Sequence, residues 1–92
     1  MKITYDPEKQ KKTLKERGLN FVDSILIFED EVFEFEDIRK DYGEKRMIAV
    51  GRLVGRMVIV GYVQRGKVKH IFSMRKANER EVKKYQEQFK KD

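Results

Sequence analysis

The chain has 92 residues, of which 41% are charged; its formal net charge is +6, and it has one histidine and no cysteine. This length predicts one domain over residues 1–92 with a small core, and the lack of cysteine excludes disulfides and thiolate metal sites. No apolar run reaches the ~20 residues of a membrane span, and the first residues lack the apolar stretch of a secretory signal. We therefore expect a cytoplasmic protein without membrane contact.

The chain begins with a predicted strand and a predicted helix. Lys2–Tyr5 alternates weakly, as a short first strand would. Asp6 precedes a proline and predicts a helix start, because Asp caps and Pro fits the first turn. Gly18 predicts the end of this helix, Pro7–Arg17, in which Leu14 is the main apolar contact.

A second helix is predicted over Phe21–Phe28, with Asn20 as its cap. One side of this helix carries a core-facing apolar stripe, made of Phe21, Ile25 and Phe28 and widened by Val22 and Leu26.

Four segments then have strand character: Val32–Glu36, Arg46–Leu53, Arg56–Gln64 and Lys67–Met74. The first has an acidic polar face and is expected at the sheet edge, whereas Arg56–Gln64 is the most apolar and is expected at the centre. Asp37–Glu44 is a predicted loop, and Arg65-Gly66 is a predicted hairpin turn. Tight turns between consecutive strands indicate an antiparallel meander.

A closing helix is predicted to about Phe89, capped by Ser73 or Asn78, and the last three residues are expected to fray. Val82, Tyr85 and Phe89 form its apolar stripe. The predicted fold class is α+β, with N-terminal helices packed on a four-stranded antiparallel sheet and a C-terminal helix.

Charge is distributed unevenly between the two halves of the chain. Residues 1–46 carry 10 basic and 12 acidic side chains, whereas residues 47–92 carry 12 basic and 4 acidic ones. A basic half of this kind favours a polyanionic partner, most often nucleic acid. The alternative is a lysine-rich solvated surface.

His70 is the first candidate for chemistry. Strict alternation predicts that it shares one strand face with Val68, Phe72 and Met74, while Arg75 lies on the other face. It is either a general acid or base, as imidazole often is, or a sheet histidine with a satisfied hydrogen bond.

Basic side chains near the strand ends are the second group of candidates. Arg75 suits bidentate binding of phosphate, and Lys76 adds a point charge. Arg46 has the same potential role, and Glu44 either orients it or acts as a base. The alternative for Arg75 and Lys76 is a pair of surface charges. If these cations bind one phosphodiester, Arg46, Arg75 and Lys76 must meet at one edge of the sheet.

The closing helix and its neighbouring strand add supporting residues. Tyr85 either bonds a phosphate, stacks on a base or packs at the edge of the core. Glu81 is expected to orient Arg or Lys, and Lys69 is a further RNA-binding candidate. The sequence has no phosphate-binding glycine loop and no carboxylate cluster at metal-ligand spacing, so we expect no metal and no organic cofactor. RNA cleavage fits, because the 2′-hydroxyl is an internal nucleophile.

The chain resembles the BrnT family, and four segments carry the resemblance. They are Tyr5-Asp6-Pro7 with Lys9, Ile27-Phe28-Glu29-Asp30, Gly43-Glu44-x-Arg46 with Gly51, and Ile71-Phe72-Ser73-Met74-Arg75-Lys76-Ala77 followed by Glu81 and Tyr85. Thr13, Arg17 and His70 depart from the family pattern of Asn, His and Arg.

This resemblance implies a RelE-like fold and an RNA-cleaving toxin that halts translation. It also implies a ribbon-helix-helix antitoxin, BrnA-like, whose complex with the toxin binds operator DNA. Two alternatives remain open: a nucleic-acid-binding module without catalysis, and a partner that binds only protein.

Overall fold

The computed structural model describes residues 1–89, so residues 90–92, where the sequence predicts a frayed end, lie outside the described residues. Five strands form one sheet: β1 (Lys2–Tyr5), β2 (Phe33–Glu36), β3 (Met47–Leu53), β4 (Arg56–Arg65) and β5 (Val68–Lys76). The α-helices are α1 (Pro7–Arg17), α2 (Ser24–Phe28) and α3 (Glu79–Tyr85), with 3-10 turns at Phe21–Asp23 and Gln86–Phe89. The predicted α+β class is confirmed.

The sheet has the order β1-β5-β4-β3-β2. The central position of β4 and the edge position of β2 follow the prediction, and β2 to β5 pair antiparallel. The predicted count of four strands and the purely antiparallel sheet are wrong, because β1 pairs parallel with β5. A parallel pair between strands 66 residues apart leaves no local turn signal in the sequence.

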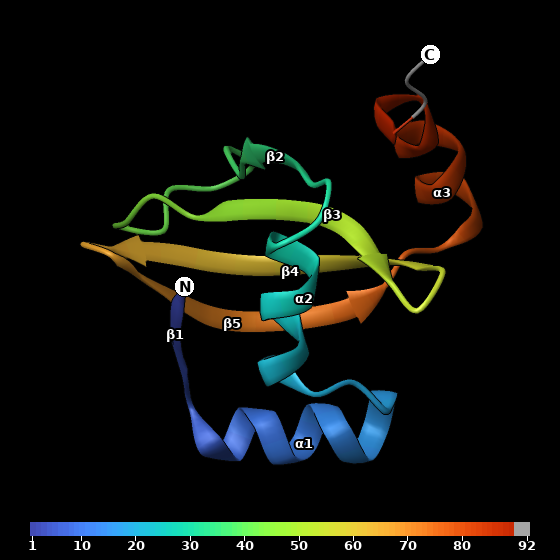
Figure 1. Cartoon of the computed structure of the whole chain (residues 1–92). Helices are drawn as coiled ribbons and strands as arrows, with labels where there is room; N and C mark the ends of the chain where they lie inside the picture. The colour runs from blue at the N-terminus through green and yellow to red at the C-terminus, as the bar shows by residue number, and fades with distance from the viewer. Residues whose placement is uncertain (90–92) are drawn as a thin grey trace.

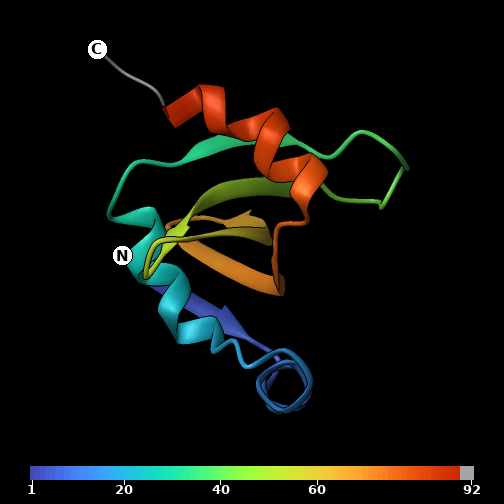
Figure 2. The same cartoon turned by 90° about the vertical axis from the view of Figure 1, so that its right-hand side faces the viewer.

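Helices cover both faces of the sheet (Figures 1 and 2). On one face, which we call the α2 face, α2 and the 3-10 turn before it pack on β3 to β5, and buried Phe21, Ile27 and Ile71 belong to the same core cluster. The other face, which we call the α3 face, carries a smaller cluster against which Val82 and Tyr85 of α3 pack.

Two details of the N-terminal helices differ from the sequence expectation. Helix α1 has the predicted bounds and caps, but Leu14 is exposed and no residue of α1 is buried. The second helix is divided into a 3-10 turn and α2, and Val22 and Leu26 point to solvent. The change of pitch turns Ser24 and Ile27 inward instead.

A β-bulge in β5 sets the faces of the residues that follow it. Gly61 pairs with Ser73 and Tyr62 pairs with Ile71, so Phe72 is left over between them. Because a bulge shifts the alternation by one residue, Met74 joins Ile71 in the core of the α2 face. The strict alternation that we expected for β5 is therefore wrong beyond Phe72.

Candidate functional site

The α3 face contains a groove of about 450 Å³ between the sheet, α3 and the segment that follows β2. We call it the α3 groove. Its charged lining residues are three cations and three carboxylates: Arg39, Arg75, Lys84, Glu36, Asp37 and Glu81. The aromatic side chains of Phe35 and Tyr85 and the apolar side chains of Ile48 and Ile59 line the rest of its wall, with Ile38 at the exposed end. The groove is polar yet close to charge balance.

Arg75 and Glu81 form the best-defined pair in the α3 groove. Both terminal nitrogens of the Arg75 guanidinium donate to the Glu81 carboxylate at 2.7 Å. Glu81 also accepts from the backbone N–H of Asn78, which completes the capping box of α3. The hydrogen bonds from Arg75 lower the pKa of Glu81 to about 2. The helix start thus fixes the carboxylate, and the carboxylate fixes the arginine.

Tyr85 forms the aromatic wall of the α3 groove. Its ring stacks on Phe35 with centroids 5.8 Å apart and lies 5.9 Å from the ring of Phe33. The apolar stripe predicted for the closing helix therefore packs on β2, and its tyrosine reaches the groove that contains Arg75.

The loop between β2 and β3 is held by a buried carboxylate. Asp37 accepts two hydrogen bonds of 2.9 Å from the Arg39 side chain and one of 3.1 Å from the Tyr42 hydroxyl. The Arg39 guanidinium holds the pKa of Asp37 well below its usual range. The backbone N–H of Asp37 donates to the carbonyl of Arg46 at 2.8 Å and closes the loop. Arg39 is thereby placed in the groove that contains Arg75.

Arg46 lies between two aromatic rings. The centre of its guanidinium is 4.3 Å from the Tyr42 ring centroid and 4.6 Å from that of Phe72. These are cation–π distances, and they fix the side chain. Its Nε is buried without a hydrogen-bond partner in the part of the chain that the structure describes. The Tyr42 hydroxyl bonds Asp37, which lines the α3 groove, so two contacts separate Arg46 from the groove lining.

Glu44 lies beside Arg46, as the sequence suggested. One carboxylate oxygen is 3.9 Å from Arg46 Nε, and the other is 3.7 Å from Arg65. Glu44 therefore bridges the loop before β3 and the end of β4. It is the carboxylate nearest to Arg46 among the ion pairs of residues 1–89.

His70 lies on the α3 face but at its outer side. It pairs with Val63 on β4 and with Thr4 on β1, and its Nδ1 is 2.9 Å from the Thr4 hydroxyl. It does not line the α3 groove. The structure therefore brings Arg75, Glu81 and Tyr85 together in the α3 groove. Arg46 and Glu44 do not line this groove: Arg46 comes one residue before the Met47–Tyr62 pair and is level with the Val63–His70 pair, whereas Arg75 pairs with Ile59.

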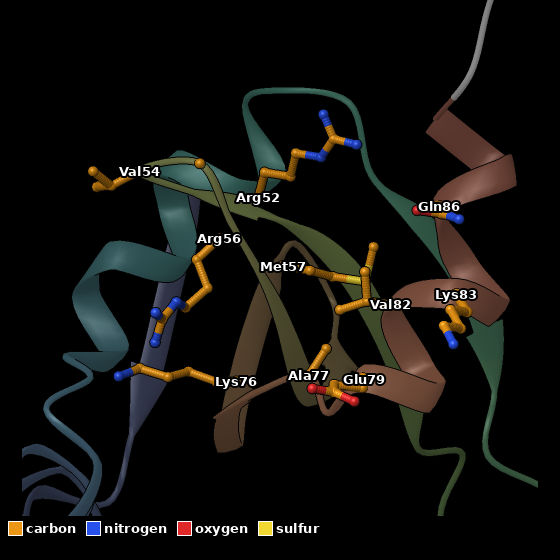
Figure 3. Close-up of a pocket in the computed structure, with 11 residues that line it drawn as sticks. Arg52, Val54, Arg56, Met57, Lys76, Ala77, Glu79, Val82, Lys83 and Gln86 are labelled. Carbon is orange, nitrogen blue, oxygen red and sulfur yellow. The ribbon is translucent and has the colours of Figure 1, made fainter.

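Lys69 and Lys76 do not join the other candidates. The Nζ of Lys69 lies 4.6 Å from the ring centroid of Tyr62, a core residue of the α2 face. Lys76 pairs with Val58, which belongs to the same core cluster, and it lines a different groove from Arg75. The expected meeting of Arg46, Arg75 and Lys76 at one edge of the sheet is therefore not found: Arg75 lines the α3 groove, Lys76 lines another groove (Figure 3), and Arg46 lines neither.

Three residues of the site were missed from the sequence: Asp37, Arg39 and Tyr42. The sequence pattern indicates only a loop over Asp37–Glu44. The available signal was an Asp at the start of the loop with an Arg two residues later, since Asp side chains often bond the backbone two residues on. Here that bond runs from the Arg39 N–H to Asp37.

Comparison with known proteins identifies a family for this chain. A family model described as "Ribonuclease toxin, BrnT, of type II toxin-antitoxin system" matches residues 5–81. No curated protein matches the chain. Within residues 1–89 no helix is long and apolar enough to cross a membrane, and no group of three or more acidic or histidine side chains is placed to hold a metal ion. The match spans most of the chain and confirms the resemblance found in the motifs: this protein belongs to the BrnT family of ribonuclease toxins of type II toxin–antitoxin systems.

Proposed function

We propose that the protein is a metal-independent endoribonuclease that inhibits translation, and that the α3 groove holds the scissile phosphate. One observation carries this assignment. The three most specific motif residues, Arg75, Glu81 and Tyr85, come from two different elements and line one groove. Packing alone does not require an arginine, a carboxylate and a tyrosine to meet there.

The proposed reaction uses the hydroxyl of the RNA as nucleophile. The 2′-oxygen attacks the adjacent phosphorus, and the bond from phosphorus to the 5′-oxygen breaks. A base removes the 2′-proton, and an acid returns a proton to the leaving 5′-oxygen. The products are a 2′,3′-cyclic phosphate and a 5′-hydroxyl. The protein must stabilise the negative charge that develops on the phosphorane oxygens, for which fixed guanidinium donors are well suited.

Arg75 and Arg46 are the proposed charge-stabilising residues. A guanidinium has five N–H donors, and the pair with Glu81 uses two of those on Arg75. Arg46 lies between two rings, and its Nε, 3.9 Å from Glu44, has no hydrogen-bond partner within residues 1–89. Glu81 is a positioning residue for Arg75. Tyr85 offers a hydroxyl to phosphate or a ring face to a base.

Glu44 and His70 are the two candidates for the proton transfer. Glu44 lies 3.9 Å from Arg46 Nε. His70 keeps its Nε2 available while Nδ1 is engaged with Thr4. Glu44→Gln and His70→Gln discriminate between them. The variant that lacks the true base should lose most of the pH-dependent cleavage rate, whereas the other variant should keep the pH–rate profile of the parent protein.

Family membership implies a protein antitoxin and an RNA target. We further propose that residues 1–92 act as one toxin domain with a RelE-like fold in the cytoplasm. The proposed antitoxin is a BrnA-like ribbon-helix-helix protein, and operator DNA is bound only through the complex.

The test is cleavage of a defined RNA by the purified full chain in EDTA, with products mapped by end chemistry. We expect 2′,3′-cyclic phosphate ends, and a rate that falls about 10²–10³-fold in Arg75→Ala. Lys67→Ala, in the β4–β5 turn, is the matched loss of a cation and should cleave normally. Intact RNA with a verified fold, or equal rates for both variants, would overturn the proposal.

A further inference from the structure

A cavity between α1 and the bulge of β5 takes no part in the function proposed above. Beyond Ile71, no strand of the described residues 1–89 pairs with the outer side of β5, and α1 lies along this free edge instead (Figures 1 and 2). The cavity has a volume of about 250 Å³, and we call it the α1 cavity. Side chains of α1 form one wall, and Phe72 and Ser73 at the bulge form the other.

The α1 wall of the cavity is cationic. Lys9, Lys12 and Arg17 line it together with one carboxylate, that of Glu16, so the net charge is three minus one, or +2. Arg17 is fixed by its hydrogen bond of 3.1 Å to the carbonyl of Met74. Neither Lys9 nor Lys12 forms an ion pair within the part of the chain that the structure describes. Two lysines without counter-charges beside one small cavity attract an anion.

The β5 wall adds an aromatic ring to these cations. Phe72 is half-buried and is the only apolar side chain among the described residues that line the cavity. The hydroxyls of Thr13 and Ser73 are the remaining polar groups of the lining. Sites for single-stranded nucleic acid combine cations that follow the phosphate backbone with rings on which bases stack. The α1 cavity therefore suits a nucleotide better than an apolar ligand.

The α1 cavity is next to both arginines of the proposed reaction. Ser73 and Arg75 flank Met74, whose side chain lies in the core of the α2 face, so both lie on the α3 face. Two residues of a strand span about 7 Å, which is comparable with the separation of successive phosphates in an extended RNA strand. Phe72 also contacts Arg46, whose guanidinium lies 4.6 Å from the ring centroid. An RNA strand with one phosphate at Arg75 can therefore place a neighbouring phosphate at the α1 cavity.

We propose that the α1 cavity binds the phosphodiester next to the scissile one, with Lys9 and Lys12 as its ligands and Phe72 as a stacking ring for the adjoining base. This inference rests on the proposed ribonuclease function, because the subsite is defined by its position relative to the scissile phosphate. Lys9 and Lys12 bind substrate and take no part in bond breaking. By holding a second phosphate they fix the RNA strand against Arg75.

The first test measures the binding of RNA that cannot be cleaved. The probe is a labelled dodecamer of 2′-O-methyl RNA, which is titrated with the full chain by fluorescence anisotropy at several salt concentrations. For single strands, each phosphate contact contributes about 0.7 to the slope of log K against log salt concentration. Lys9→Gln with Lys12→Gln should therefore reduce this slope by about 0.7 and weaken binding about five-fold at about 0.1 M salt.

The matched control is Lys11→Gln with Lys15→Gln, which removes two lysines of α1 that do not line the cavity. This control pair should change the affinity less than about two-fold, because exposed charges outside the contact are screened by salt. Both double variants should unfold at the urea midpoint of the parent, since Gln and Lys have similar helix propensities. Equal losses of affinity for the two pairs, or an unchanged salt slope in Lys9→Gln with Lys12→Gln, would overturn the proposal.

The second test places the subsite beside the cleavage position. A methylphosphonate is uncharged, so RNA with a methylphosphonate at one of the two phosphates adjacent to the cleavage site should lose the same contact as the lysine variant. The parent should cleave this RNA about five-fold more slowly than unmodified RNA, and Lys9→Gln with Lys12→Gln should show no further loss. A full further loss for methylphosphonates on either side contradicts the subsite. If the parent cleaves no RNA, the proposed nuclease fails, while the binding test still decides whether the α1 cavity holds a phosphate of RNA.

Discussion

The ion pair between Arg75 and Glu81 makes a quantitative prediction about acid stability. The variant Glu81→Gln removes the charge, while the glutamine oxygen can still accept from the Asn78 N–H and keep the capping box. If the whole depression of the pKa of Glu81, from 4.5 to about 2, acted on folding, it would be worth about 3 kcal/mol. The Arg75 side chain is 44% exposed, so solvent screening reduces the expected value to about 1–2 kcal/mol.

The sign follows from the direction of the pKa. A carboxylate whose folded pKa is depressed stabilises the fold above its unfolded pKa, and this contribution is lost as the pH falls toward the folded pKa. Glu81→Gln should therefore unfold with a free energy about 1–2 kcal/mol lower than the parent at pH 7. This difference in unfolding free energy between the parent and Glu81→Gln should become smaller between pH 5 and pH 3. Urea unfolding followed by circular dichroism at several pH values measures both quantities.

The control is Glu79→Gln, which removes another first-turn carboxylate of α3 that has no ion pair within residues 1–89. Glu79→Gln should lower the free energy of unfolding by only about 0.3–1 kcal/mol, the value of a carboxylate near the positive end of the helix dipole. The reasoning is refuted if the gap between the parent and Glu81→Gln is the same at pH 3 as at pH 7, or if both variants behave alike.

Three further predictions concern stability and are all measured by urea unfolding. Gly61→Ala should lower the free energy of unfolding by about 1–3 kcal/mol, because the added Cβ would lie 2.7 Å from ring atoms of Phe72. An unchanged urea midpoint would mean that the Phe72 ring moves aside without cost. Arg17→Met should lower the free energy of unfolding by about 1 kcal/mol, because Arg17 donates to the carbonyl of Met74 at 3.1 Å. Unchanged stability would show that this hydrogen bond does not stabilise the fold. Val54→Asn should stabilise by about 1 kcal/mol, because Val54 in the β3–β4 turn adopts a left-handed φ of 50°, which strains a β-branched residue; a loss of stability would show that the turn is not strained.

Signals in neighbouring residues correctly predicted the features that short-range contacts determine, such as the ends of helices. Asp6 and Gly18 fix both ends of α1, because the Asp6 side chain accepts from Glu8 and Gly18 takes the left-handed cap. Asn78 caps α3 for the same reason. The central place of β4 followed from its apolar composition, since the middle strand is covered on both faces.

Long-range packing decided what the sequence left open. The β1–β5 pair joins segments at the two ends of the chain, and nothing within Lys2–Tyr5 specifies its partner. Leu14 and Leu26 have helical spacing that fits a buried stripe, yet the helices turn other residues inward. In the site, a motif predicted the group of Arg75, Glu81 and Tyr85, whereas Arg39 reached the groove through a loop whose closure is tertiary.

The bulge at Phe72 connects the fold to the proposed chemistry. In a regular strand, Arg75 would share the face of Ile71 and point toward α2. The extra residue turns Met74 into the core of the α2 face and Arg75 onto the α3 face, where Glu81 fixes it. The same residue supplies the ring on which Arg46 lies. One irregularity thus turns Arg75 onto the α3 face and supplies one of the two rings that Arg46 contacts. Bulges commonly redirect side chains next to active sites, and the departure from alternation that misled the sequence prediction adjoins the site that we propose.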